Sequence, residues 1–476
     1  MLATVLNLVD DSVTAIVIGK SERALNEEIY FETNKKILRV TRKRIIIIRG
    51  SSLNCSFYLT LHENSRKPFI KGKKMIYFQK RSAFMKSYLV KVGSMIDVVA
   101  KETKTEIGIL VEDGWIKEVK PFSQFSSDYE VVDYGNQVVM PGMINCHVHI
   151  GMDPVKTSEQ REKMNEVEVI LYAYGNMSSY LNSGVTMVRN QGTSNFVDLK
   201  LKKMIERNEI EGPTIIASGP SICMTGGHGH RSGLESDGED ECRKSARYLL
   251  KNGVDTVKFM ATGGVMTDGV EPGSEQLSAK EVFAIVEEAK KAGKLSSSHA
   301  QGSKGIMNVV QAGATSVEHG IYLTDEIIDI MVEKGVYLVP TLSAVHFILE
   351  NGVEGGVPEY AVKKCEKVYD FHINSFKKAY QKGVKIAMGT DAGTPFNLHE
   401  NSWKEFELMM QHGMTAMDAL RSGTIVAAEM VKKDEAYGSI EVGKRADFII
   451  LSENPLENIS CLKEVEHVYK HGVKVK

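Results

Sequence analysis

The sequence predicts an α/β protein, a (β/α)8 TIM barrel with a small β-sandwich domain built from both flanks of the barrel. Three observations support this prediction. Short apolar runs alternate with helical stretches over residues 141–435. The segments on either side, 85–140 and 436–476, show only strand and turn patterns. The 476 residues are enough for one barrel with an attachment.

Eight apolar runs are the candidate barrel strands. They are residues 138–150, 184–190, 214–220, 255–262, 294–300, 314–320, 336–342 and 385–392. Helical stretches that end in Gly or Ser separate most of them, as in the repeated strand–helix units of a parallel sheet. Eight such units imply a closed barrel. An open, doubly wound sheet is the alternative, but no GxGxxG motif follows an early strand.

The flanks of the barrel are short strands joined by tight turns. ILVEDGWIKEV has the form of a hairpin, and GSIEVGKRADFIIL at the other end of the chain has a similar pattern. We therefore expect the two flanks to pair into one small domain.

Residues 1–84 form an atypical basic N-terminal extension. They contain 16 Lys and Arg against 7 Asp and Glu, a net charge of +9. We interpret this segment as either disordered or not native, with the natural chain starting at Met85. The run KGKKMIYFQKR at 71–81 is basic and aromatic, but a solvated tail explains it better than RNA binding does.

The overall composition indicates a cytoplasmic protein without nucleic-acid or membrane partners. The formal net charge is -2, and no apolar stretch is long enough to cross a bilayer. The first residues lack a basic region, and Asp10 and Asp11 interrupt their apolar run, so they make a poor signal peptide. The six cysteines form no CxxC pair, which fits a reducing compartment.

Polar residues stand at the ends of five of the eight candidate strands. They are His147, His149, Lys258, His299, His319 and Asp391. Because side chains alternate along a strand, His147 and His149 point to the same side. Each residue alone has an ordinary explanation as a hydrogen-bonded, capping or surface residue. Together they lie where barrel enzymes carry their chemistry, and imidazole and carboxylate are ligands for zinc and similar ions.

The motifs around these residues resemble those of the amidohydrolase superfamily. The motifs are PGMINCHVHIG, VKFMATGGVMT, SSSHAQG, SVEHG and GTDAGTP. The resemblance spans roughly residues 86–476 and is nearest to the Xaa-Pro dipeptidase (prolidase)-like and imidazolonepropionase-related branch. It implies that His147, His149 and Asp391 bind one zinc ion, and that His299 and His319 bind a second. It also implies that Lys258 reacts with CO2 to form a carbamate that bridges the two ions.

The implied reaction is hydrolysis of an amide or peptide bond in a small substrate, a dipeptide or an N-acyl amino acid. A metal-bound hydroxide is the nucleophile, and Asp391 carries the proton to the leaving nitrogen. Candidate substrate-binding residues lie in the strand-end loops. They are His228, also a candidate catalytic residue, His230, Tyr322 and Arg189. Each has an alternative explanation. His228 and His230 could belong to a solvated flexible loop, Tyr322 could pack against a loop, and Arg189 could form an internal salt bridge.

Two other functions stay open. A mononuclear, imidazolonepropionase-like hydrolase of cyclic amides would use His147, His149, His299 and Asp391 and leave Lys258 unmodified. A catalytically silent scaffold would have lost ligands, whereas this sequence keeps all the strand-end positions. The oligomeric state is also open. A homo-oligomer is compatible with the surfaces of β-sandwiches and barrels, which often pair with a second copy.

Overall fold

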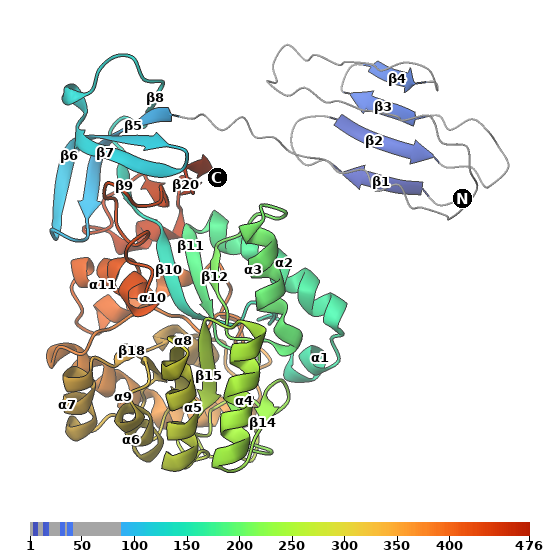
Figure 1. The fold of residues 1–476 in the computed structure, drawn as a ribbon, viewed down its shortest axis with the longest axis vertical. Coiled ribbons are helices and arrows are strands. Elements are labelled where there is room, and N and C mark those ends of the chain that lie inside the picture. The colour runs from blue at the N-terminus through green and yellow to red at the C-terminus, as the bar shows by residue number, and fades with distance from the viewer. Residues whose placement is uncertain (1–2, 8–12, 19–28, 34–35, 41–86) are drawn as a thin grey trace. The chain divides into compact units, whose positions relative to one another are not determined.

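The computed structural model describes residues 3–7, 13–18, 29–33, 36–40 and 87–476 (Figure 1). The chain divides into two compact units, Met1–Phe84 and Met85–Lys476. In the first unit, four strands form an antiparallel sheet in the order β1-β2-β3-β4. Their bounds are Ala3–Asn7, Val13–Ile18, Ile29–Thr33 and Lys36–Val40. The prediction of an atypical basic extension, disordered or not native, concerns this unit, and its basic run at 71–81 lies outside the described residues.

In the second unit, both flanks contribute strands to one mixed sheet, in the order β21-β20-β19-β9-β5-β6-β7, with β8 beside β5. The strands are β5 (Ser87–Asp97), β6 (Glu102–Glu112), β7 (Trp115–Pro121), β8 (Val131–Asp133), β9 (Val138–Pro141), β19 (Phe448–Leu451), β20 (His467–Lys470) and β21 (Val473–Lys474). We call this the composite sheet. Its two halves meet where β9 and β19 pair antiparallel, with Val139 opposite Ile450. Alternate apolar side chains of these strands form a buried cluster of their own.

Parallel strands form the body of the second unit. β10 (Met143–Val148), β11 (Val185–Asn190) and β12 (Thr214–Ile216) make one sheet, and the order β14-β13-β15-β16-β17-β18 makes another. The strands of the second sheet are β13 (Ile222–Cys223), β14 (Leu234–Glu235), β15 (Thr256–Met260), β16 (Leu295–Ala300), β17 (Ser316–His319) and β18 (Tyr337–Val339). Nearly every residue of β10, β11, β15, β16 and β17 is buried, as expected for parallel strands covered on both faces.

Two candidate strands differ from the sequence prediction. The run 138–150 is not one strand: it divides at Gly142, whose backbone packs against Thr186, into β9 of the composite sheet and β10. The run 385–392 is not a continuous strand either. It makes single parallel bridges, Leu338 with Ile386 and Val148 with Ala392.

Further hydrogen bonds join these pieces into a curled sheet. The Asp255 amide donates to the Ala217 carbonyl at 2.8 Å, which connects the chain after β12 to the start of β15. At the other side, the Cys146 amide donates to the Met388 carbonyl at 2.8 Å and the Leu338 amide to the Lys385 carbonyl at 2.9 Å. The segment 385–392 therefore lies between β18 and β10.

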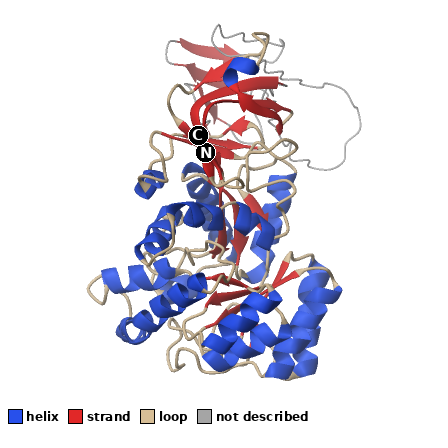
Figure 2. Cartoon of the chain, turned by 90° about the vertical axis from the view of Figure 1, so that its left-hand side faces the viewer, coloured by secondary structure: helices blue, strands red, loops and turns tan. Residues whose placement is uncertain are grey.

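Helices cover the outside of the parallel strands (Figures 1 and 2). They are α1 (Ser158–Glu162), α2 (Glu166–Asn182), α3 (Val197–Glu206), α4 (Glu239–Asn252), α5 (Ala279–Lys291), α6 (Ser303–Ala312), α7 (Asp325–Lys334), α8 (Leu342–Asn351), α9 (Glu359–Gln381), α10 (Ser402–Gln411), α11 (Ala416–Ser422) and α12 (Ile425–Met430). Local sequence fixes several ends: Ser278 and Glu281 form a capping box at the start of α5, and Gly313 and Gly335 end α6 and α7 with positive φ. Their apolar faces pack on the strands in one large core. None of the helices in the described part of the chain has the length and apolar character needed to cross a bilayer.

Candidate metal centre

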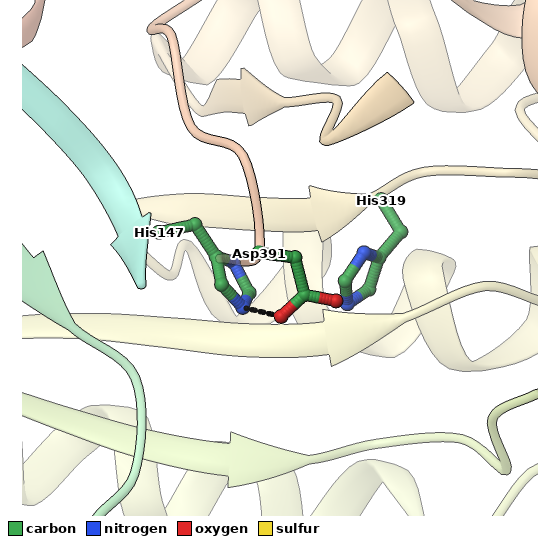
Figure 3. Close-up of side chains that lie close together, drawn as sticks. All are labelled: His147, His319 and Asp391. Atoms are coloured by element: carbon green, nitrogen blue, oxygen red, sulfur yellow. Dashed lines mark ion pairs between the residues drawn. The ribbon is translucent and has the colours of Figure 1, made fainter. Parts of the chain in front are cut away.

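Three side chains from distant parts of the chain converge at the carboxyl ends of the parallel strands (Figure 3). His147 comes from β10, His319 ends β17, and Asp391 lies in the segment after β18. One ligand atom from each lies within 4.8 Å of the other two. His149 is close as well, with its Nε2 3.0 Å from Asp391 Oδ1, while His147 Nε2 is 3.3 Å from the same oxygen.

Asp391 Oδ1 is a buried oxygen that accepts no hydrogen bond from the described residues. Two imidazole nitrogens lie within ion-pair distance of it, but their geometry is not that of hydrogen bonds. A buried carboxylate oxygen without a donor is costly. A cation held jointly by the oxygen and the imidazole nitrogens would satisfy it, so this donor set fits a divalent metal ion.

The backbone around the centre is strained. His319 and Asp391 have φ of 70° and 61°, and Thr341 has 52°, in the left-handed region that residues other than Gly rarely adopt. Thr341 Oγ1 lies 2.7 Å from His319 Nδ1, so it fixes the ring of a candidate ligand. Strain of this kind persists where the surrounding structure enforces it, commonly at functional sites.

A fully buried ion pair orients His147. Glu318 Oε2 lies 2.7 Å from His147 Nδ1, and Arg189 Nη2 donates to both oxygens of Glu318 at 2.8 and 2.9 Å. Burial alone would raise the pKa of Glu318, but Arg189 and His147 hold it well below its usual range. The charged carboxylate therefore accepts the Nδ1 hydrogen of His147 and leaves Nε2 free to bind a metal.

The same contacts exclude Arg189 as a substrate ligand. Its Nε donates to the Cys146 carbonyl at 2.6 Å and its Nη1 to Ser316 Oγ at 2.8 Å, and the side chain is fully buried. The structure thus shows the internal salt bridge that the sequence analysis gave as the alternative. Sequence reasoning did not find the role of Glu318, although a glutamate inside an apolar strand, in SVEHG, was a usable signal.

Lys258 lies on β15 with 1% of its surface exposed. The carboxylates of Glu318 and Asp391 act on its charge from the neighbouring strand ends. Burial lowers the pKa of this lysine to about 8, against the opposing effect of Glu318 and Asp391, so a neutral amine is accessible near pH 7. A fully buried lysine with a lowered pKa is unusual and is a candidate for chemical modification.

His299 and His228 extend the centre away from Asp391. The ring centroids of His299 and His319 are 4.5 Å apart, and those of His228 and His299 are 4.2 Å apart. His228 Nδ1 lies 2.8 Å from Thr267 Oγ1, and burial lowers the pKa of His228 to about 4, so the ring is neutral. A Cβ at Gly264 would lie 2.6 Å from His228 Cε1, so only glycine lets the ring sit this close.

The other candidate substrate-binding residues lie around this group with partial exposure. His230 Nδ1 is 2.8 Å from the Gly227 carbonyl, in the loop that also carries His228. The ring of Tyr322 packs against Phe371 on α9, with centroids 5.0 Å apart. Neither of these contacts uses the full hydrogen-bonding capacity of the side chain.

A curled parallel sheet with histidines and an aspartate at its carboxyl ends defines a class of barrel hydrolases that carry a metal site at the strand ends. Residues 138–475 match the model of the amidohydrolase family, and the chain belongs to this family. Ochratoxinase from Aspergillus niger is 31% identical over 378 residues, which cover 70% of this chain and 75% of the relative.

Solved structures agree with this assignment. A Xaa-Pro dipeptidase with bound methionine in its active site is 33% identical, with a TM-score of 0.77 over 82% of this chain and 100% of that one. A putative prolidase from Bifidobacterium longum is 29% identical, with a TM-score of 0.73 over 82% of this chain and 94% of that one. The protein therefore has a TIM-barrel-type fold and belongs to the prolidase-like branch. It is a hydrolase that acts on carbon–nitrogen bonds.

Proposed function

We propose that the protein uses two divalent metal ions, zinc in the first instance, to hydrolyse an amide or peptide bond in a small substrate. The observation that carries this proposal is the convergence of His147, His319 and Asp391 around a buried carboxylate oxygen that lacks a hydrogen-bond donor. The donor set suits a metal ion, and its place at the strand ends is where barrel enzymes hold their substrates.

The ligands divide into two groups in this proposal. His147 and His149 would hold one ion together with Asp391, and His299 and His319 would hold the second. Lys258, carboxylated by CO2, would supply both ions with an anionic oxygen ligand. The burial and the lowered pKa of Lys258 support this assignment, because a plain ammonium would repel both cations, whereas a neutral amine can add to CO2.

The residues of the chain have separate roles. When bound, the metal ions act as Lewis acids and lower the pKa of a water molecule. Asp391 accepts the proton of the attacking water on a carboxylate oxygen and passes it to the leaving nitrogen. Glu318 keeps the Nδ1 proton on His147. The neutral ring of His228 donates a hydrogen bond to the scissile carbonyl oxygen, with Thr267 holding its other nitrogen.

The substrate is a dipeptide or an N-acyl amino acid. The similar proteins support this, since one is named a Xaa-Pro dipeptidase, one a putative prolidase and one an ochratoxinase. His230 and Tyr322 are the proposed contacts to the polar groups of the substrate, because both lie beside His228 or His319 in the chain and keep partial exposure.

Hydrolysis assays on zinc-loaded protein test the proposal. The panel contains Xaa-Pro dipeptides, other dipeptides, N-acyl amino acids and ochratoxin. We expect turnover of at least one class, two zinc ions per chain by atomic emission, and loss of turnover in Asp391→Asn. One ion per chain with cyclic-amide hydrolysis would instead support the mononuclear alternative. Protein that binds no zinc and turns over nothing would overturn the proposal.

Two finer structural points belong to the same proposal. We infer that the eight parallel segments close into a complete barrel, supported by the hydrogen bonds of segment 385–392 to both β10 and β18. We also place the protein in a reducing compartment, the cytoplasm, since each cysteine among the described residues is buried and unpaired.

A further inference from the structure

Gln191 carries an unexplained polar group inside the barrel region. It directly follows β11, is fully buried, and its Nε2 is a buried donor without a hydrogen-bond partner among the described residues. Buried donors are almost always satisfied in folded proteins, so an orphaned one indicates a missing acceptor.

The hydrogen bond of Gln191 to Ser297 places its amide at the face of the sheet that carries Lys258. Its Oε1 accepts a hydrogen bond from Ser297 Oγ at 2.9 Å. Ser297 on β16 is the direct register partner of Lys258 on β15, so the two side chains lie on the same face of the sheet. Ser297 Oγ also lies 3.3 Å from Thr256 Oγ1, two residues before Lys258 and again on that face.

The backbone of Gln191 lies beside the strand that carries His147 and His149. Its backbone amide donates to the carbonyl of Val148, the residue between His147 and His149, at 2.9 Å. The carbonyl of the next residue, Gly192, lies 3.5 Å from His149 Nδ1. The side chain of Gln191 therefore reaches from the strand of the two histidines across to the strands that carry Ser297 and Lys258.

We propose that Gln191 is a positioning residue for the carboxylated lysine, and that its Nε2 donates a hydrogen bond to a carbamate oxygen on Lys258. This inference rests on the proposed two-metal function. The neutral amine of Lys258 forms an N–C bond to CO2, one C=O π bond becomes a C–O⁻ group, and the nitrogen releases one proton to solvent. The product is an anion, and an amide donor stabilises an anion without the positive charge that would compete with the metal ions.

The amide also has the right polarity for this task. Ser297 holds Oε1, so the free end of Gln191 is a donor, which suits a carbamate and would not serve a cation. Gln301 offers a contrast, because the atom it leaves unpartnered is the acceptor Oε1. Its side chain is similarly buried, which makes it a matched control for the loss of a buried glutamine.

The test measures carbamate formation directly. Zinc-loaded wild-type protein is titrated with ¹³C-bicarbonate at fixed pH, and the carbamate carbon is followed by ¹³C NMR. We expect Gln191→Met to need roughly tenfold more bicarbonate for half-saturation, the factor that one hydrogen bond to a charged group supplies. Gln191→Glu, which brings a second anion, should show still less carbamate. Gln301→Met should titrate as the wild type does.

Two further measurements make the result decisive. Zinc per chain is counted at limiting and at saturating bicarbonate, and saturating bicarbonate should restore two ions in Gln191→Met. If that variant does not fold, Ser297→Ala serves instead: it frees the amide to rotate and should shift half-saturation in the same direction. Equal titration curves for the wild type and the variants would overturn this inference alone. A wild type without a carbamate signal would overturn the two-metal proposal as well.

Discussion

Replacing Arg189 with methionine tests whether the buried ion pair holds the metal centre. Arg189 and Glu318 are both fully buried, and their side chains share two hydrogen bonds. Removing one partner of such a pair leaves an uncompensated charge and costs about 3–5 kcal/mol. We expect Arg189→Met to lose unfolding free energy of this size, although methionine fills much of the same volume.

The same change should weaken metal binding. Without Arg189 the pKa of Glu318 rises, because burial is then opposed mainly by His147. A protonated Glu318 is a poorer acceptor for the Nδ1 hydrogen of His147, so we expect zinc affinity to fall about 10–100-fold, as for other residues that orient a ligand.

A double-mutant cycle provides the assay. Urea unfolding of metal-free protein compares wild type, Arg189→Met, Glu318→Gln and the double variant, and competition with a chelator gives the zinc affinity of each. The double variant should recover much of the stability lost in Arg189→Met, because it removes the stranded charge. Two results would refute this reasoning. One is a loss of unfolding free energy below about 1 kcal/mol in Arg189→Met, which is the range of exposed ion pairs. The other is strict additivity of the two substitutions in the cycle.

Three further predictions concern other parts of the site. Thr341→Gly relieves a left-handed residue but removes the contact to His319, so stability should stay within about 1 kcal/mol while zinc affinity falls about tenfold; unchanged affinity would contradict it. Lys364 on α9 donates to two carbonyls of the loop 263–276, so Lys364→Met should speed hydrogen exchange of that loop, and unchanged exchange would be a negative result. Burial lowers the pKa of His399 to about 4, so the folded state excludes a proton that the unfolded state binds below pH 6.5. Stability is therefore lost as pH falls from 6.5 towards 4, by about 2 kcal/mol from this group at pH 5. Urea midpoints at pH 7 and pH 5 should differ less in His399→Gln, and an equal difference would argue against this account.

The positions of the candidate ligands could be predicted because each follows an apolar run, and parallel strands bring their carboxyl ends together. The group formed by His147, His319 and Asp391 agrees with that reasoning. The alternation of side chains along a strand could not predict Glu318, because His319 has φ of 70° and breaks the regular pattern. Glu318 and His319, although adjacent in the chain, can therefore both contribute to the candidate metal centre.

The details of the last strand could not be predicted either. The apolar run at 385–392 has the composition of a strand, but its hydrogen bonds go to two neighbours at separate points and Asp391 turns the backbone to φ of 61°. The apolar composition of a segment predicts that it is buried, as this segment is. It does not predict the direction that the backbone takes. Arg189 shows a similar limit, since the sequence cannot say whether a buried arginine faces a substrate or an internal carboxylate.

The composite sheet has a consequence for synthesis on the ribosome. β9 lies between β5 and β19, and the register joins Val139 to Ile450, so one side of β9 has no partner until the end of the chain is made. At about 5–20 residues per second, the intervening chain takes on the order of 15–60 s to synthesise. During that time the nascent protein exposes an apolar strand edge, a known site of aggregation. We therefore expect the yield of folded protein to depend on chaperones that bind the growing chain.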